Sequence, residues 1–290
     1  MTTSQPAPNK PRPAPSNLTL RIVTALIGGP LVLVLTYIDG WWFAAAAAAI
    51  AAIAILELYA LGRNRDLQGQ ALVGVPAVVG LATLVAAGRA DLLAAALLLA
   101  AAGSALAALA DRAPRSRRVY RALVTLAGVI YIGLPSAYLV ALRELPEGFT
   151  WLLLVLAITW GTDSLAFAGG RLWGKRLLAP RISPKKTVEG AVIGTLGGAF
   201  LGALWLLAND RLLPELLPLL VIGPPAAVAG DLFESRIKRF FHAGDSHLSG
   251  FNLIPGHGGV LDRIDSLSWV TTLCWAYFQV SGLAARLAGV

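Results

Sequence analysis

Long apolar segments follow one another along this chain, and they limit the folds it can adopt. We count nine segments of about 20 residues, the length that an α-helix needs to cross the hydrocarbon core of a bilayer. They cover residues 20–38, 41–60, 71–87, 91–110, 122–142, 149–169, 188–208, 215–233 and 267–288. Transmembrane β-strands are shorter and alternate between apolar and polar residues, which these segments do not. The sequence therefore predicts an all-α, polytopic integral membrane protein with about nine transmembrane helices.

The distribution of basic residues predicts the orientation of these helices. Charged residues make up only 14% of the 290 residues, against about 25% in soluble domains. In a nine-span topology, 20 of the 24 Lys and Arg residues fall on the side of the N-terminus, and the other side holds only Arg89, Arg143, Arg211 and Arg286. Because cytoplasmic loops carry the excess of Lys and Arg, we expect a cytoplasmic N-terminus. This basic face would attract anionic membrane lipids, and we expect no nucleic-acid partner.

The chain divides into a tail and two membrane regions. Residues 1–17 are rich in Pro and Ser and are predicted to form a disordered cytoplasmic tail. Residues 18–145 contain few polar groups and are predicted to be a scaffold of membrane helices. Residues 146–290 are predicted to be the catalytic membrane region, because polar and basic residues gather in two cytoplasmic loops, 170–187 and 234–266. Cys274 lies alone in an apolar segment and is predicted to fill space in the core.

Glu57 and Asp163 are acids within apolar segments, where a charge is costly and by default indicates function. For Asp163 we favour a role in a substrate site over a purely structural hydrogen bond. For Glu57 we favour a structural role in which a neighbouring helix satisfies the carboxyl group, and support of a site is the alternative. Four glycines at four-residue spacing, Gly190, Gly194, Gly198 and Gly202, are predicted to allow close contact between helices.

The first cytoplasmic loop has the composition of a phosphate-binding segment. It carries two hydroxyls and two lysines, at Ser183, Lys185, Lys186 and Thr187. Pro180 and Pro184 end any preceding helix, and Ser183 or Thr187 is placed to cap the helix that follows. Hydroxyls, ammonium groups and a helix N-terminus together suit a triphosphate. The alternative, a solvated loop that is basic because it is cytoplasmic, stays open on this segment alone.

A polar stripe follows at the cytoplasmic end of the eighth segment. On a helix, residues at i, i+3, i+4 and i+7 share one face, and here they are Asp231, Glu234, Ser235 and Lys238. Two carboxylates, a hydroxyl and an ammonium group therefore lie on one face at the edge of the bilayer. The structural alternative is an isolated stripe of ion pairs, and the cost of placing such a stripe there makes us favour a functional site.

A glycine-rich turn directly before the last apolar segment carries the densest chemistry. Residues 255–259 read Pro-Gly-His-Gly-Gly, and Asp262, Arg263 and Asp265 follow. Such a turn lets the backbone approach phosphate oxygens closely. Asp262 and Asp265 would face the same way on a helix and, with Asp231, would supply the hard oxygen ligands that Mg²⁺ prefers. The alternative is that acids at a helix N-terminus merely complement the helix dipole.

Together these segments resemble the phosphatidate cytidylyltransferase family, also called the CDP-diacylglycerol synthase family. The family signature runs Ser-x-x-Lys-Arg, then a Lys-Asp pair, then Pro-Gly-His-Gly-Gly-x-x-Asp-Arg-x-Asp. The matching residues are Ser235, Lys238, Arg239, Pro255, Gly256, His257, Gly258, Gly259, Asp262, Arg263 and Asp265. The resemblance is specific over residues 150–275 and weak before them. One departure is that Gly244-Asp245 stands where the family has Lys-Asp, within a longer stretch; Asp245 keeps the acid.

The resemblance implies transfer of CMP from CTP to phosphatidate, which gives CDP-diacylglycerol and pyrophosphate at the cytoplasmic face of a bacterial inner membrane. It implies that Asp231, Asp262 and Asp265 bind Mg²⁺, with a second metal ion left open, and that the protein forms a homodimer. The cations that would neutralise phosphates are Lys185, Lys186, Lys238, Arg239 and Arg263. Ser183, Thr187 and His257 would donate hydrogen bonds to phosphates, and the remaining substrate-binding residues would be Asp163, Glu234, Ser235 and Asp245.

Two other functions stay open at this point. The missing lysine is also compatible with a diverged family member that has another acceptor or no activity. A protein of a different class, a transporter with intramembrane acids, would have two similar halves with matching broken helices. The polar residues of this chain gather in one half, which argues against a transporter.

Overall fold

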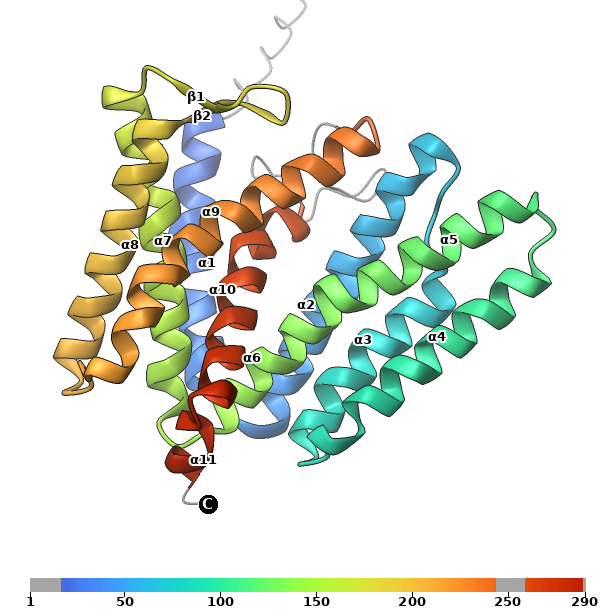
Figure 1. The fold of residues 1–290 in the computed structure, drawn as a ribbon, viewed down its shortest axis with the longest axis horizontal. Coiled ribbons are helices and arrows are strands. Elements are labelled where there is room, and N and C mark those ends of the chain that lie inside the picture. The colour runs from blue at the N-terminus through green and yellow to red at the C-terminus, as the bar shows by residue number, and fades with distance from the viewer. Residues whose placement is uncertain (1–16, 244–258, 289–290) are drawn as a thin grey trace, which may run out of the picture.

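The chain folds into a bundle of helices with one small hairpin at its end (Figure 1). The structure, a computed structural model, describes residues 17–243 and 259–288. Its first half contains α1 (Asn17–Tyr37), α2 (Gly40–Leu61), η1 (Gly62–Arg65), α3 (Ala71–Ala86), η2 (Ala90–Leu92), α4 (Leu93–Ala110), α5 (Arg115–Gly128), η3 (Val129–Gly133) and α6 (Leu134–Glu144). Its second half contains α7 (Gly148–Trp173), β1 (Leu177–Ala179), β2 (Ser183–Thr187), α8 (Val188–Ala208), η4 (Pro214–Leu216), α9 (Leu217–Phe240), α10 (Leu261–Val280) and α11 (Leu283–Ala288).

The prediction of a helical membrane protein is confirmed at the level of fold class. Within the described residues, six helices are long and apolar enough to cross a membrane. They are Gly40–Arg65, Ala90–Ala110, Arg115–Glu144, Gly148–Trp173, Val188–Ala208 and Pro214–Phe240. Helix α3 is apolar but has only 16 residues. The count of nine spans and the cytoplasmic N-terminus stay predictions.

Two predicted segments differ in detail from the structure. The expected loop 170–187 contains an antiparallel hairpin, in which Leu177 pairs with Thr187 and Ala179 with Ser183. The last expected span, 267–288, starts earlier as α10 and is interrupted before α11 at Gly282, where φ is +68°. A glycine adopts this left-handed conformation without the steric cost that a side chain would bring, so the chain can turn there.

A π-helical segment, η3, interrupts the long helix that runs from α5 into α6. Pro135 lies in the first turn of α6. Proline has no N–H to give to the carbonyl oxygen four residues earlier, which belongs to Tyr131. Single π-helical turns of this kind change the direction of the following side chains and are frequent near functional sites. The interruption falls at Tyr131, whose hydroxyl is buried.

Helices α7 and α8 pack face to face through the predicted glycine stripe. A Cβ atom on Gly194 would lie 2.5 Å from the carbonyl oxygen of Thr162, and one on Gly198 would lie 2.8 Å from that of Ile158. Both distances are too short for any side chain, so only glycine allows the two backbones to approach this closely. The prediction that these glycines serve packing is confirmed.

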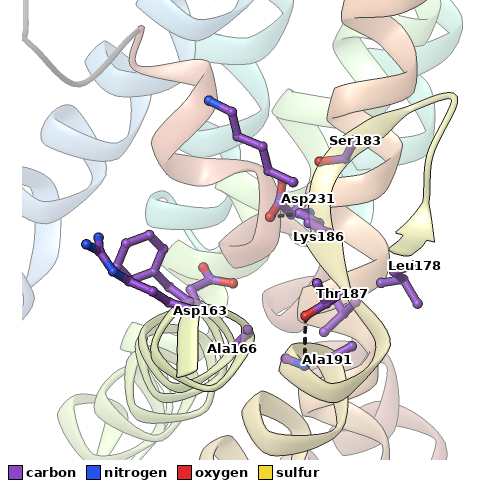
Figure 2. A pocket seen from close by; sticks show the side chains of 14 residues that line it. Asp163, Ala166, Leu178, Ser183, Lys186, Thr187, Ala191 and Asp231 are labelled. Carbon is purple, nitrogen blue, oxygen red and sulfur yellow. Dashed lines mark hydrogen bonds and ion pairs between the residues drawn. The ribbon is translucent and has the colours of Figure 1, made fainter. Parts of the chain in front are cut away.

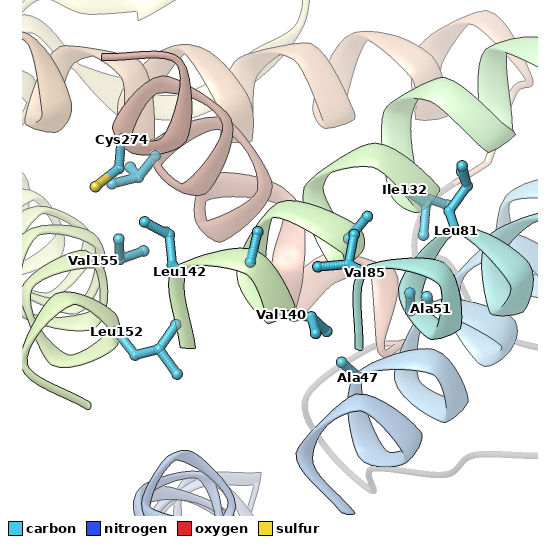
Figure 3. Close-up of a cluster of buried hydrophobic side chains, with 14 of the residues drawn as sticks. Ala47, Ala51, Leu81, Val85, Ile132, Val140, Leu142, Leu152, Val155 and Cys274 are labelled. Atoms are coloured by element: carbon cyan, nitrogen blue, oxygen red, sulfur yellow. The ribbon is translucent and has the colours of Figure 1, made fainter. Parts of the chain in front are cut away.

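Buried aliphatic side chains from both halves of the chain form one continuous core (Figure 3). Ala47 and Ala51 of α2 contribute to it on one side, and Leu152 and Val155 of α7 on the other. Cys274 is buried in the same cluster, as expected of a small core residue. This shared core gives the scaffold helices a fixed place relative to the helices that carry the polar residues.

Candidate active site

Three carboxylates from two helices meet at one end of the bundle. Helix α9 contributes Asp231 and Glu234, and α10 contributes Asp265; one oxygen of each lies within 4.8 Å of the others. Glu234 and Asp265 are buried. Oε1 of Glu234 is buried without a hydrogen-bond partner among the residues that the structure describes. Because buried like charges repel each other strongly, such a group is unfavourable unless protons or cations compensate part of its charge.

Asp262 lies beside this group and is bound by a lysine. Nζ of Lys238 is 2.8 Å from Oε2 of Glu234 and 3.3 Å from Oδ1 of Asp262. Oδ2 of Asp262 also accepts a hydrogen bond of 3.2 Å from the Gly259 N–H. The structure therefore brings the predicted ligands Asp231 and Asp265 together with Glu234. Asp262 instead pairs with Lys238 and lies outside the group of three.

A cavity of about 510 Å³ opens next to the carboxylates (Figure 2). Helices α7, α8 and α9 and the hairpin form its walls. Lys186 of β2 extends across it and forms an ion pair with Asp231. The polar lining residues are Asp163, Arg171, Ser183, Lys185, Lys186, Thr187 and Asp231. The cavity thus offers cations and hydroxyls directly beside an acidic group.

Asp163 connects α7 to α10 at the border of this cavity. Oγ of Ser266 donates a hydrogen bond of 3.4 Å to Oδ1 of Asp163, and the Ser266 N–H donates one of 2.8 Å to Oδ1 of Asp265. One serine therefore holds acids from two helices in a fixed relation. Asp163 thus bonds to a neighbouring helix and also lines the cavity, and its role in a substrate site stays a prediction.

The hairpin is attached to the helices at both of its ends. Thr187 caps α8, because its Oγ1 accepts the Gly190 N–H at 3.1 Å. Glu189 accepts the backbone N–H groups of Lys175 and Arg176, at 3.0 and 3.1 Å. Nε of Arg239 donates to the carbonyl oxygen of Ile182 at the hairpin turn, at 3.2 Å. These contacts fix the strand that presents Lys185 and Lys186 to the cavity.

The remaining predicted residues lie around this centre or outside the described part. Ser235 is half-buried on α9, and Arg263 is exposed on the first turn of α10. Arg239 is exposed and directed to the hairpin backbone rather than to the cavity. His257 and Asp245 fall in residues 244–258, outside the described residues.

Two residues of the first half come close to the site: Tyr131, which no sequence pattern indicated, and Glu57, for which support of a site was the alternative prediction. Tyr131 has a buried hydroxyl without a hydrogen-bond partner in the described part of the chain. Its ring lies against that of Phe233 on α9, with the ring centroids 5.2 Å apart. Glu57 bonds directly to the start of α10. The position of Glu57 in an apolar segment indicated a special role, but the residues that it binds lie more than 200 positions away in the sequence.

The fold and these contacts define a helical membrane protein whose acidic and basic groups are arranged for phosphate chemistry. Comparison with known proteins agrees. The sequence model of the Cytidylyltransferase family matches residues 19–281. A protein of Brucella abortus named phosphatidate cytidylyltransferase is 35% identical over 267 residues, which cover 90% of this chain and 93% of that protein.

Shorter matches carry the same name. The phosphatidate cytidylyltransferase of Bacillus subtilis is 39% identical over 150 residues, 51% of this chain and 54% of that protein. That of Thermotoga maritima is 38% identical over 135 residues, 44% of this chain and 48% of that protein. The chain belongs to the cytidylyltransferase family, and the prediction of a nucleotidyltransferase is confirmed.

Proposed function

We propose that this protein transfers CMP from CTP to phosphatidate and releases pyrophosphate. An oxygen of the lipid phosphate attacks the α-phosphorus of CTP, and the bond from that phosphorus to the bridging oxygen breaks. Pyrophosphate leaves with the electron pair, and the product is CDP-diacylglycerol. Because the lipid phosphate is itself the nucleophile, the protein needs to supply position and charge rather than a nucleophilic side chain.

The observation that carries this proposal is the meeting of Asp231, Glu234 and Asp265 beside a cavity lined by lysines. A triphosphate and a lipid phosphate bring several negative charges to one place. A site with carboxylates alone would repel these phosphates. A site with lysines alone could bind them, but it would leave the buried acids without a role. The combination suits substrates that bind through a divalent cation and through direct ion pairs at once.

The donor set fits Mg²⁺. This ion prefers hard oxygen ligands, which carboxylates supply. Asp231, Glu234 and Asp265 place such oxygens within 4.8 Å of one another. We propose that Asp231 and Asp265 would hold the ion and that Asp262 would join them once Lys238 binds substrate instead. The bound ion would neutralise developing charge on the phosphates.

The basic side chains bind the phosphates in this proposal. Lys186 and Lys185 reach the triphosphate from the hairpin, and Lys238 and Arg263 reach it from the ends of α9 and α10. Ser183, Thr187 and His257 donate hydrogen bonds to phosphate oxygens. Asp163 shapes the nucleotide end of the cavity together with Ser266 and Arg171. Glu234, Ser235, Arg239 and Asp245 complete the substrate site.

The membrane setting follows from the charge pattern. We propose nine spans with the N-terminus and the site at the cytoplasmic face of a bacterial inner membrane, where CTP is available. Residues 18–145 act as the scaffold and residues 146–290 as the catalytic region, with the homodimer as the working form. The diacylglycerol part of the substrate stays in the bilayer beside α8 and α9, whose exposed side chains include Phe200, Leu204 and Val221.

The test is an assay of the purified protein in nanodiscs with CTP, phosphatidate and Mg²⁺. We expect pyrophosphate release and CMP bound to lipid, each dependent on all three components. Release with another phospholipid or polyprenyl phosphate in place of phosphatidate would indicate an altered acceptor. Absence of release with every acceptor would contradict the proposal and favour an inactive family member or a transporter.

A further inference from the structure

Glu57 of α2 binds the first turn of α10. Its side chain is 1% exposed. Oε1 accepts the Val260 N–H at 3.1 Å, and Oε2 accepts the Leu261 N–H at 2.8 Å. Both carboxylate oxygens of a residue in the scaffold half are therefore used at the helix that carries Asp262 and Asp265.

These hydrogen bonds replace a cap that α10 does not provide itself. The first N–H groups of a helix have no partner within the helix, and buried ones must find a partner elsewhere. Val260, at the N-cap position, makes no capping hydrogen bond with its side chain. Asp262 accepts the Gly259 N–H, which precedes the two N–H groups that Glu57 binds. The negative charge of Glu57 also lies at the positive end of the helix dipole, which strengthens the attachment.

The attachment determines where the acids of α10 lie. Asp265 follows Leu261 by four residues, about one turn of helix, so the two residues share a face. A displacement of the first turn would move Asp265 relative to Asp231 and Glu234 on α9. The 4.8 Å grouping of the three carboxylates depends on this relative position.

The same part of the chain also holds the end of α9. Nδ2 of Asn64 donates to the carbonyl oxygen of Phe241 at 3.1 Å. The Arg65 guanidinium lies 2.6 Å from Nε2 of His242 and 4.5 Å from the centre of the Phe240 ring. Helix α2 and η1 are thus bonded to both helices that contribute carboxylates.

We propose that Glu57 is a positioning residue for the metal-binding acids: it fixes the start of α10, while Asn64 and Arg65 fix the end of α9. The part of this inference that concerns Mg²⁺ rests on the proposed function. It gives the first half of the chain a defined part in the reaction besides filling the membrane. Glu57 touches neither substrate nor metal and acts through the backbone of α10.

Glu57→Gln is the sharpest variant, because it keeps the size of the side chain and removes one acceptor oxygen. The new amide group has N–H donors facing a backbone N–H, so one of the two hydrogen bonds is lost. Ser104→Ala is the matched control: Ser104 is equally buried in the scaffold half and bonds to Gln70, at 2.7 Å, rather than to α10. Glu57→Asp keeps the charge and tests for rescue.

Hydrogen exchange on the intact protein in nanodiscs tests the attachment without any assay of activity. In Glu57→Gln we expect the amides at the start of α10 to exchange about tenfold faster than in the wild type, because a charge-assisted hydrogen bond is lost. Ser104→Ala should leave this segment unchanged. Equal exchange in wild type and Glu57→Gln would overturn the proposal, whether or not the protein transfers CMP.

Kinetics with CTP and phosphatidate test the consequence. We expect Glu57→Gln to need about tenfold more Mg²⁺ for half-maximal rate, with Glu57→Asp between it and the wild type. A merely structural defect would lower the active fraction without moving the Mg²⁺ requirement, and that result would overturn the positioning role. If Glu57→Gln is not recovered folded, the same comparison is made with Glu57→Asp. If the wild type is inactive, the proposed function is refuted, and the exchange experiment alone decides whether Glu57 fixes the start of α10.

Discussion

Lys186 of the hairpin forms an ion pair with Asp231 of α9, and both residues line the cavity (Figure 2). Each of these residues also has a proposed partner in the reaction, a phosphate for the lysine and Mg²⁺ for the aspartate. The ion pair therefore holds the two groups close together, and in the proposed reaction the substrate complex takes its place. Substitution of either residue therefore also removes the opposite charge with which the other one pairs.

Removal of the Lys186 charge should weaken nucleotide binding. Lys186→Met loses a charge-assisted contact to the triphosphate, and we expect KM for CTP to rise about tenfold or more. Lys175→Met is the control, because Lys175 is exposed on the same segment and its backbone N–H, not its ammonium group, makes the contact to Glu189. Initial rates at varied CTP measure the effect. Equal KM values in both variants would contradict a role for Lys186 at the triphosphate.

Removal of the Asp265 charge should abolish most of the activity without unfolding the protein. Asp265→Asn keeps the shape of the side chain and removes a proposed metal ligand, so kcat/KM should fall about 100-fold. Asp91→Asn makes the same chemical change in an exposed ion pair with Arg89 and should change the rate little. Thermal unfolding of each variant separates lost catalysis from lost structure. Near wild-type activity of Asp265→Asn would exclude it as a ligand.

Local periodicity was sufficient to predict much of the site. The spacing of Asp231, Glu234 and Lys238 places them on one face of a helix, and the structure has them there, with Lys238 bonded to Glu234. The cap of α8 by Thr187 also follows from its type and place in the sequence. Such features depend on residues within two turns of one another, so the sequence specifies them directly.

Contacts between distant segments could not be predicted from such local patterns. Glu57 and Leu261 are 204 positions apart, and no spacing rule relates them. The expectation that a neighbouring helix satisfies Glu57 was correct in kind, and the partner is the helix that carries the proposed metal ligands Asp262 and Asp265. In the same way, the grouping of Glu234 rather than Asp262 with Asp231 and Asp265 depends on how α9 and α10 cross.

Close packing of α7 and α8 should make the glycine stripe intolerant of side chains. Gly194→Ala would put a Cβ atom 2.5 Å from the Thr162 carbonyl oxygen, and overpacking of this kind costs about 1–3 kcal/mol. The control is Gly80→Ala in α3, where a Cβ atom meets nothing within 4 Å. There we expect stability to be unchanged or to rise by about 0.5–1 kcal/mol. Thermal unfolding in detergent checks both; equal melting temperatures would contradict the packing described for Gly194.

Binding of Mn²⁺ in place of Mg²⁺ tests the central claim most directly, since its electron paramagnetic resonance signal reports bound ion without any need for turnover. Titration of the protein in nanodiscs should show saturable binding in the wild type and in Asp91→Asn. It should show binding weakened about tenfold or more in Asp231→Asn and in Asp265→Asn. Binding that is equally tight in all four proteins would contradict the claim that acids of α9 and α10 hold one divalent cation between them.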